Sequence, residues 1–293
     1  MDCKQAGIDL HIHSTASDGT LSPVEILRLA EKLELGAISI TDHDTLKGSQ
    51  CLLETAASSD VRVLTGIEIS TVSPALHPVA GSFHILGYGI RLNDPELNQT
   101  LEILQQAREN RNPFIINCLN AMGMDITIEE VIETSGEAQI GRPHIAQLMI
   151  KKGFVKTINE AFDRYLGFNK PAYIDKYRLG CQEAIEMIIA AGGIPVLAHP
   201  FLLGIQDNSR LESLVATLKE MGLQGIEVYY PEHSLSYVEF YSQLARSHDL
   251  AITGGTDFHG ALKPDIQLGY GKGDFFVPYS VYDLLLKRQH TMV

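Results

Sequence analysis

The sequence IDLHIH, at residues 8–13, predicts a short buried strand that ends on two histidines. Successive strand residues point to opposite faces, so His11 and His13 project from the same side of this strand. The next segment, SPVE at residues 22–25, matches an S-x-x-E capping box with proline at the first helical position. It predicts a helix that ends at Gly36, so the chain opens with the strand and helix of an α/β fold.

The same alternation continues on both sides of a long helical stretch. Further strands are predicted at 37–41, 61–70, 83–88, 194–199, 225–230 and 250–254, and further helices at 45–58, 182–191, 209–221, 235–248 and 281–289. Between about residues 95 and 177 helical periodicity dominates, and no run is typical of a core strand. About seven buried, mostly parallel strands favour a (β/α) barrel over an open sheet. We expect a barrel at 1–98 and 178–293, and at 99–177 an inserted helical subdomain that caps the substrate.

Length and composition are those of an ordinary globular protein. The 293 residues suffice for two domains or one large barrel, and 45% hydrophobic with 20% charged residues excludes a disordered chain. The formal net charge of −13 disfavours binding to duplex nucleic acid, and an anionic substrate would need bound cations. The four scattered cysteines indicate neither a disulfide framework nor a thiolate zinc site. Without a signal peptide or a long apolar run, we expect a cytoplasmic protein with no membrane contact.

Histidines and carboxylates recur at or near the predicted strands. They are His11, His13, Asp42, His43, Asp44, Glu68, His84, His199, Asp257 and His259. Because the carboxyl ends of barrel strands form one active-site face, these groups are expected to converge on one pocket. So many buried imidazoles and carboxylates need cations between them. Nitrogen and oxygen ligands without thiolates suit manganese, zinc or iron, so we expect two or three divalent ions that share a bridging carboxylate.

Six short motifs carry a family resemblance. They are DLHIHS at 9–14, SDG at 17–19, TDHD at 41–44, GIE at 66–68, AHP at 198–200 and GTDFH at 255–259. In this order they resemble the motifs of the PHP superfamily (polymerase and histidinol phosphatase), over about residues 8–260. The resemblance implies a distorted (β/α)7 barrel with a trinuclear metal centre. It assigns His11, His13, Glu68 and Asp257 to the first metal, Glu68, His84 and His199 to the second, and Asp18, His43 and His259 to the third.

The resemblance extends to one subgroup of that superfamily. The motifs GRPHIA at 141–146, KPAY at 170–173 and GIEVY at 225–229 are similar to those of the nucleoside 3′,5′-bisphosphate phosphatases, some of which also trim short RNA from its 5′ end. Residues 169–170 depart from the arginine-rich stretch expected there, which leaves the length of the substrate open. The implied partner is therefore a small nucleotide or short single-stranded RNA, with no obligate protein partner.

These observations predict a metal-dependent phosphohydrolase. A hydroxide that bridges two metal ions would attack the 3′-phosphate in line, and no side-chain nucleophile is needed. The expected substrate contacts are Ser14, Arg142, His144, Lys170 and His233, of which His233 is also a candidate general acid. Arg108 and Arg111, on the helical segment, could line a groove for a second phosphate, but a solvated helical face is favoured.

Two alternatives remain open at this stage. The chain could hydrolyse histidinol phosphate or another small phosphomonoester, or it could be a metal-stabilised scaffold without catalytic activity. The complete set of candidate ligands counts against the scaffold.

Overall fold

The computed structural model describes residues 7–79, 82–135 and 139–290. The strands are β1 (Ile8–Ile12), β2 (Ala37–Ile40), β3 (Arg62–Val63), β4 (Gly66–Val72), β5 (Phe83–Tyr88), β6 (Leu179–Gly180), β7 (Ile194–Leu197), β8 (Gly225–Tyr229) and β9 (Ala251–Gly254). The helices are α1 (Pro23–Lys32), α2 (Lys47–Thr55), α3 (Pro95–Ala121), α4 (Ile128–Ser135), α5 (Arg142–Lys151), α6 (Ile158–Ala161), α7 (Cys181–Ala190), α8 (Asn208–Glu220), α9 (Leu235–Ser247) and α10 (Tyr279–His290). This order confirms the predicted mixed α/β fold.

The strands form two sheets that meet on two sides of a common interior. One sheet has the order β1-β2-β3 and the other the order β6-β4-β5-β7-β8-β9. An isolated bridge between Ile12 and Phe258 joins β1 to the segment after β9, and another between His43 and Glu68 joins the segment after β2 to β4. Isolated bridges, rather than continuous pairing, therefore connect the two sheets.

The prediction of mostly parallel strands is confirmed, with β5 as the exception. This strand pairs antiparallel with β4 and with β7, whereas β7, β8 and β9 pair parallel with one another. Because β5 runs in the opposite direction, its first residues lie at the edge where its neighbours end. His84, the second residue of β5, thereby reaches the same edge as Glu68 and His199.

The prediction of a single strand at 61–70 is wrong, because the chain passes from one sheet to the other within these residues. β3 pairs with β2, whereas β4 pairs with β5. Between them the Ser49 hydroxyl lies 2.9 Å from the carbonyl oxygens of both Ile40 and Gly66. A Cβ atom on Gly66 would lie 2.2 Å from Ser39 Oγ, so only glycine allows the chain to turn this close to β2.

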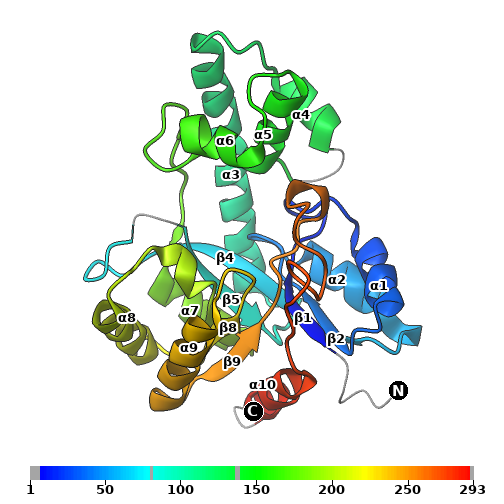
Figure 1. The fold of residues 1–293 in the computed structure, drawn as a ribbon, viewed down its shortest axis with the longest axis vertical. Helices are drawn as coiled ribbons and strands as arrows, with labels where there is room; N and C mark the ends of the chain where they lie inside the picture. The colour runs from blue at the N-terminus through cyan, green and yellow to red at the C-terminus, as the bar shows by residue number, and fades with distance from the viewer. Residues whose placement is uncertain (1–6, 80–81, 136–138, 291–293) are drawn as a thin grey trace.

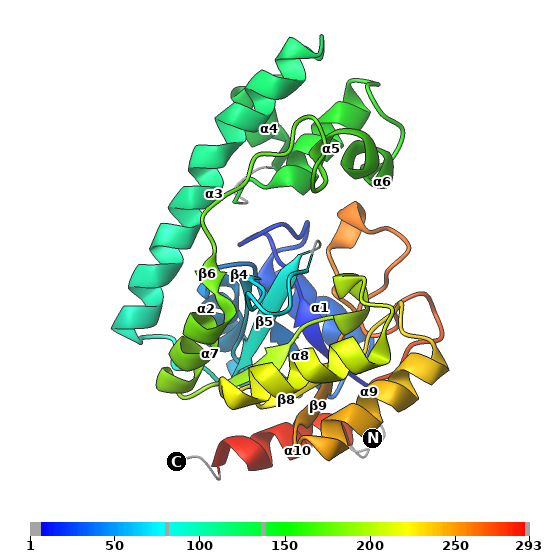
Figure 2. The same ribbon diagram turned by 90° about the vertical axis from the view of Figure 1, so that its left-hand side faces the viewer.

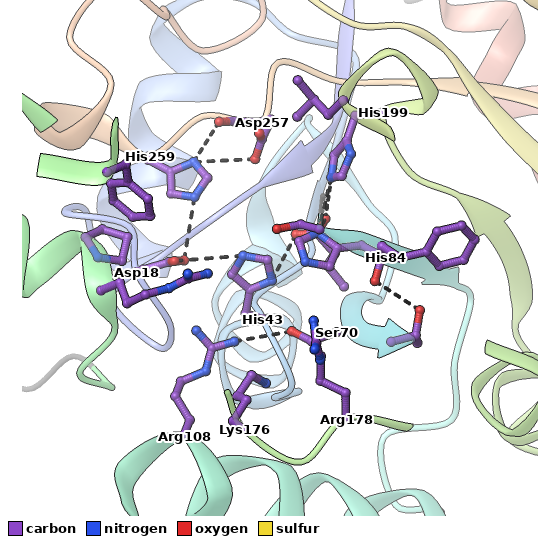
Figure 3. A pocket seen from close by; sticks show the side chains of 18 of the residues that line it. Asp18, His43, Ser70, His84, Arg108, Lys176, Arg178, His199, Asp257 and His259 are labelled. Atoms are coloured by element: carbon purple, nitrogen blue, oxygen red, sulfur yellow. Dashed lines mark hydrogen bonds and ion pairs between the residues drawn. The ribbon is translucent and has the colours of Figure 1, made fainter. Parts of the chain in front are cut away.

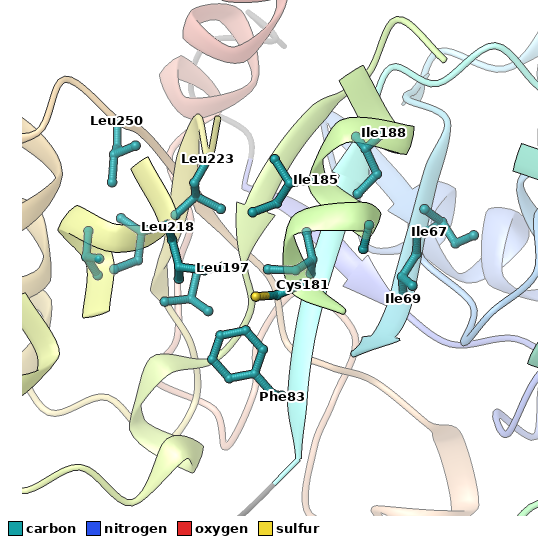
Figure 4. Close-up of a cluster of buried hydrophobic side chains, with 14 of the residues drawn as sticks. Ile67, Ile69, Phe83, Cys181, Ile185, Ile188, Leu197, Leu218, Leu223 and Leu250 are labelled. Carbon is teal, nitrogen blue, oxygen red and sulfur yellow. The ribbon is translucent and has the colours of Figure 1, made fainter. Parts of the chain in front are cut away.

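Helices cover both sheets on their outer faces. In Figures 1 and 2, α7, α8 and α9 lie against the larger sheet, α1 and α2 lie beside β1 and β2, and α10 closes the end opposite the helical segment. Ile185 and Ile188 of α7 pack with Ile67, Ile69 and other apolar side chains in one buried cluster (Figure 4). Within the described residues no helix is both long enough and apolar enough to cross a bilayer.

The helical segment at 99–177, which we call the cap, has its own apolar core. Ile145, Met149 and Leu166 pack there with Ile115 and other buried side chains. Figures 1 and 2 show α4, α5 and α6 above one end of the strands, connected to them by the long helix α3. The predicted boundary at residue 99 falls inside α3. Leu97, near the start of this helix, packs in the buried cluster beside the larger sheet, so α3 belongs to both parts of the molecule; we call residues 1–98 and 178–293 the barrel part.

Candidate metal centre

Glu68 lies at the centre of a cluster of imidazoles. Its two carboxylate oxygens lie 2.7 Å from His84 Nδ1, 2.9 Å from His199 Nε2, 3.1 Å from His13 Nε2, 3.1 Å from His43 Nδ1 and 3.4 Å from His11 Nε2. Only 1% of the Glu68 side chain is exposed. Four segments far apart in the sequence thus direct nitrogen atoms toward one buried carboxylate.

The structure brings together all nine side chains that the resemblance assigned to metals. Donor atoms lie within 4.8 Å of one another in three groups: His11, His13, Glu68 and Asp257; His13, Asp18, His43 and His259; and His43, Glu68 and His84. The first group contains the four residues assigned to the first metal. His199 Nε2, assigned to the second metal, lies 3.2 Å from His84 Nδ1. The assignment of each residue to a particular ion stays a prediction.

The donor atoms have the character that a cation site requires. His11 Nε2, His13 Nε2 and His43 Nδ1 are buried 3.1–3.4 Å from the Glu68 carboxylate, and His199 Nδ1 is buried without a hydrogen bond. Burial lowers the pKa of His43 and of His259 to about 3, so both rings stay neutral with a free lone pair. Burial also lowers the pKa of His13, but hydrogen bonds and charge from Asp257 and Glu68 raise it overall to about 9. These residues therefore fit divalent cations, because a proton or a metal ion must separate the imidazoles from the carboxylates.

Glu227 supports this cluster and was not singled out from the sequence. Its side chain is fully buried, with Oε1 2.9 Å from His11 Nδ1 and Oε2 accepting the His199 backbone N–H at 2.7 Å. A carboxylate on one ring nitrogen fixes the tautomer of a histidine and directs its other nitrogen to a metal. The available signal was a glutamate in the middle of an otherwise buried strand, at 225–230.

A cavity of about 270 Å³ lies between the imidazole cluster and the cap. Seven candidate ligands line it: Asp18, His43, Glu68, His84, His199, Asp257 and His259. Six cations line it too: Arg108, Arg111, Arg142, Lys176, Arg178 and Lys263. Figure 3 shows Arg108, Lys176 and Arg178 on the side of α3, with the histidines across the cavity from them. The chain is acidic overall, but in the lining of this pocket the six cations outnumber the four carboxylates, Asp18, Glu68, Asp175 and Asp257.

The favoured expectation, that Arg108 and Arg111 lie on a solvated helical face, is wrong, and the cavity agrees with the alternative that they line a groove. Their exposed fractions are 7% and 6%, because this face of α3 is turned toward the barrel part. Burial, together with repulsion from Arg142 and Arg108, lowers the pKa of Arg111 to about 9. The Nε atom of Arg111 is buried without a hydrogen bond, so this guanidinium lacks part of the hydration or pairing it normally has.

Of the five predicted substrate contacts, Arg142 is the one that lines the cavity. Its Nη1 donates to the Leu166 carbonyl at 2.9 Å, and its guanidinium lies 5.5 Å from the ring centres of both Phe162 and Tyr173. This packing holds the side chain in one orientation. His144 instead accepts the Gly141 N–H on Nδ1 at 3.1 Å and so caps its own helix.

The other three predicted contacts lie elsewhere. Ser14 is fully buried and donates to Asp42 Oδ2 at 2.6 Å. The Nδ1 atom of His233 lies 2.7 Å from the Val228 carbonyl oxygen, within an aromatic group that includes Tyr230 and Tyr241. Lys170 is exposed on the cap. None of these three side chains is among the residues that line the described cavity.

Comparisons with known proteins agree with this geometry. Residues 9–192 match the PHP domain family. The chain is 33% identical to a 3′,5′-nucleoside bisphosphate phosphatase of Chromobacterium violaceum, over 87% of each chain. It is 30% identical to a 5′-3′ exoribonuclease of Haemophilus influenzae, over 86% of this chain and 89% of that one. Among solved structures, a protein of Bifidobacterium adolescentis assigned as a metal-dependent phosphoesterase superposes with a TM-score of 0.82 at 28% identity, covering 97% of this chain and 96% of that one.

Proposed function

This chain belongs to the PHP domain family, and we propose that it is a metal-dependent phosphoesterase that removes the 3′-phosphate of nucleoside 3′,5′-bisphosphates. One observation carries the proposal: a single cavity has a buried histidine and carboxylate cluster on one wall and a group of arginines and lysines on the other. Such a cavity suits a small substrate with two phosphates, one at the cluster and one at the cations. This arrangement, with the relatives, favours an enzyme over a scaffold.

Nine side chains would hold the metal ions. They are His11, His13, Asp18, His43, Glu68, His84, His199, Asp257 and His259, and they offer the nitrogen and oxygen donors that manganese, zinc and iron accept. Divalent ions at such a cluster supply activated water and neutralise charge on a reacting phosphate. With two or three ions the cluster needs no side-chain nucleophile.

The cap would bind the phosphate that does not react. Arg111 and Arg142 lie on the cap wall of the cavity, and a guanidinium binds phosphate oxygens with two parallel hydrogen bonds. The two aromatic rings that Arg142 contacts carry no negative charge. These contacts therefore hold the guanidinium in place without neutralising it. These two side chains would orient the substrate so that its other phosphate faces the histidines.

A second candidate substrate is short 5′-phosphorylated RNA. The identity to the Haemophilus exoribonuclease covers nearly the whole chain, and the same cap cations could bind an RNA 5′-phosphate. Histidinol phosphate, the third candidate, has a single phosphate. With that phosphate at the metal cluster, it would leave the cationic wall of the cavity without a phosphate to bind.

The test is phosphate release by manganese-loaded protein from a set of substrates. We expect turnover of adenosine 3′,5′-bisphosphate, with weaker activity on AMP and on histidinol phosphate. Release of mononucleotides from 5′-phosphorylated tetranucleotide RNA would extend the activity to RNA. Turnover of histidinol phosphate alone would reject the proposed substrate, and inactivity on every substrate with metals bound would favour the scaffold.

Replacement of Arg111 by methionine is expected to raise KM for adenosine 3′,5′-bisphosphate about tenfold or more. A hydrogen bond to a charged group contributes about 1.5–3 kcal/mol, and methionine fills the same space without the charge. Adenosine 3′-phosphate lacks the 5′-phosphate, so its kinetic constants should change less than about twofold. Steady-state kinetics on both substrates measures the difference.

The matched control is Arg164→Met, because Arg164 is another arginine of the cap but is 54% exposed and paired with Glu160. It should leave both substrates unaffected. Equal losses on both substrates in Arg111→Met would contradict a role at the second phosphate.

A further inference from the structure

Asp44 is a buried carboxylate on which three side chains of the cap converge. Its Oδ2 accepts from Arg108 Nη2 at 2.8 Å and from Lys176 Nζ at 2.9 Å, and its backbone carbonyl accepts from Gln105 Nε2 at 3.1 Å. Arg108 and Gln105 come from α3, whereas Lys176 comes from the segment that returns to the barrel part. One acidic residue thus connects both chain segments that join the cap to the rest of the protein.

The barrel part fixes Asp44 in turn. The Ser70 N–H donates to Asp44 Oδ1 at 2.8 Å, and the Ser70 hydroxyl donates to Oδ2 at 3.0 Å. Asp44 directly follows His43, and Ser70 lies two residues after Glu68, so the carboxylate is anchored to two segments that carry candidate metal ligands. Figure 3 shows Arg108 reaching toward Ser70 beside His43.

Charge balance gives this contact a specific consequence. Arg108 and Lys176 line the cavity, but Asp44 does not, so the carboxylate neutralises these cations from behind the cavity wall. Burial lowers the pKa of Lys176 to about 8 even with Asp44 beside it. Without the carboxylate, Arg108 and Lys176 would repel each other and Arg111 in a poorly solvated space.

We propose that Asp44 is a positioning residue that holds the cap cations at a fixed place opposite the metal cluster, and thereby determines preference for substrates with a second phosphate. The proposal rests on the proposed function, because the second phosphate is what the cations are placed to bind. Asp44 itself makes no contact with the substrate. Its effect reaches the substrate through Arg108 and Lys176.

The test is Asp44→Asn, which removes the charge and keeps the shape. Asp44 has a φ of 56°, and asparagine is among the residues that tolerate this left-handed conformation. We expect kcat/KM for adenosine 3′,5′-bisphosphate to fall about tenfold or more, mainly through KM, since a buried cation loses its partner. For adenosine 3′-phosphate the change should stay below about threefold, with the metal content unchanged.

A second measurement needs no substrate. Hydrogen exchange of backbone amides at residues 99–112 and 173–178 should become faster in Asp44→Asn, because the contacts that dock these segments are weakened. In a double-mutant cycle, Lys176→Met should lower the free energy of unfolding less in the Asp44→Asn variant than in the wild-type protein. The matched control is Asp249→Asn, since Asp249 also has a positive φ of 47° and an arginine partner but is exposed at the surface.

The outcomes separate this inference from the proposed function. Equal loss on both nucleotides together with loss of metal would overturn it, because Asp44 would then serve the metal cluster. Unchanged hydrogen exchange and an unchanged preference between the nucleotides would also overturn it. Wild-type protein inactive on both nucleotides would reject the proposed function, whereas the exchange measurement would still test whether Asp44 docks the cap.

Discussion

Asp257→Asn is expected to lower kcat on adenosine 3′,5′-bisphosphate by roughly 10³-fold or more. Asp257 Oδ1 lies 3.1 Å from His13 Nε2 and 3.6 Å from His11 Nε2, so it would share a metal ion with both histidines. An amide lacks the negative charge of a carboxylate ligand. Because a bound ion contributes several kcal/mol of charge stabilisation in the transition state, its loss or displacement has a large effect on rate.

The fold should survive this substitution. Asparagine has nearly the same shape and tolerates the φ of 53° at Asp257. Tyr230 Oη and Lys263 Nζ, which donate to Oδ2 at 2.9 and 2.6 Å, could still donate to the amide oxygen. Circular dichroism and bound metal per chain, measured beside kcat, separate loss of an ion from unfolding. A folded Asp257→Asn variant with undiminished kcat would contradict the assignment of Asp257 to a metal.

Removal of divalent ions by a chelator is expected to abolish turnover and to lower Tm by roughly 10 °C. An ion that binds only the folded state stabilises it by about 4 kcal/mol at 1,000 times its Kd, and each kcal/mol shifts Tm by about 2–4 °C in a chain of comparable size. Without ions, the buried Glu68 and Asp257 carboxylates each lie 3.1 Å from His13 Nε2 and have only nearby imidazoles and Lys263 to balance their charge. Calorimetry and phosphate release before and after chelation measure both effects.

Adding back manganese, zinc, iron or magnesium separately then identifies the metal that restores both Tm and activity. Magnesium should restore least, since it prefers an all-oxygen shell and this cluster is rich in imidazoles. Metal-free protein that keeps full turnover would refute the metal-dependent function. Recovery of Tm without recovery of turnover would point to a structural role for the ions.

The course of α3 explains why a solvated face was favoured for Arg108 and Arg111 over a groove for phosphate. Arg108 and Arg111 are three residues apart, and this spacing shows only that they share a helix face. Which face is buried depends on the placement of α3 against the barrel part, a contact between distant segments. The strongest local signal, charge on a helix, is typical of a solvated surface, so the prediction from sequence was wrong.

Strand direction and side-chain partners likewise could not be predicted from local sequence patterns. The apolar run at 83–88 predicts a strand but not its direction, and the antiparallel pairing of β5 places His84 at the cluster. Ser14 and His144 stand in motifs that suggested substrate contact, but the first bonds Asp42 and the second caps α5. A hydroxyl or imidazole serves a ligand or its own backbone equally well, and only the fold decides between them.

By itself the sequence determined the alternating strands and helices, the helical segment near its middle and the types of donor atom, because periodicity and residue chemistry are local properties. Only the tertiary structure decided that imidazoles from four separate segments meet at Glu68, that β5 runs in the opposite direction, and that Asp44 holds the cations of the cap at the wall opposite the metal cluster. Those features depend on contacts between residues far apart in the chain, whose energies are set by burial and charge once the segments pack together.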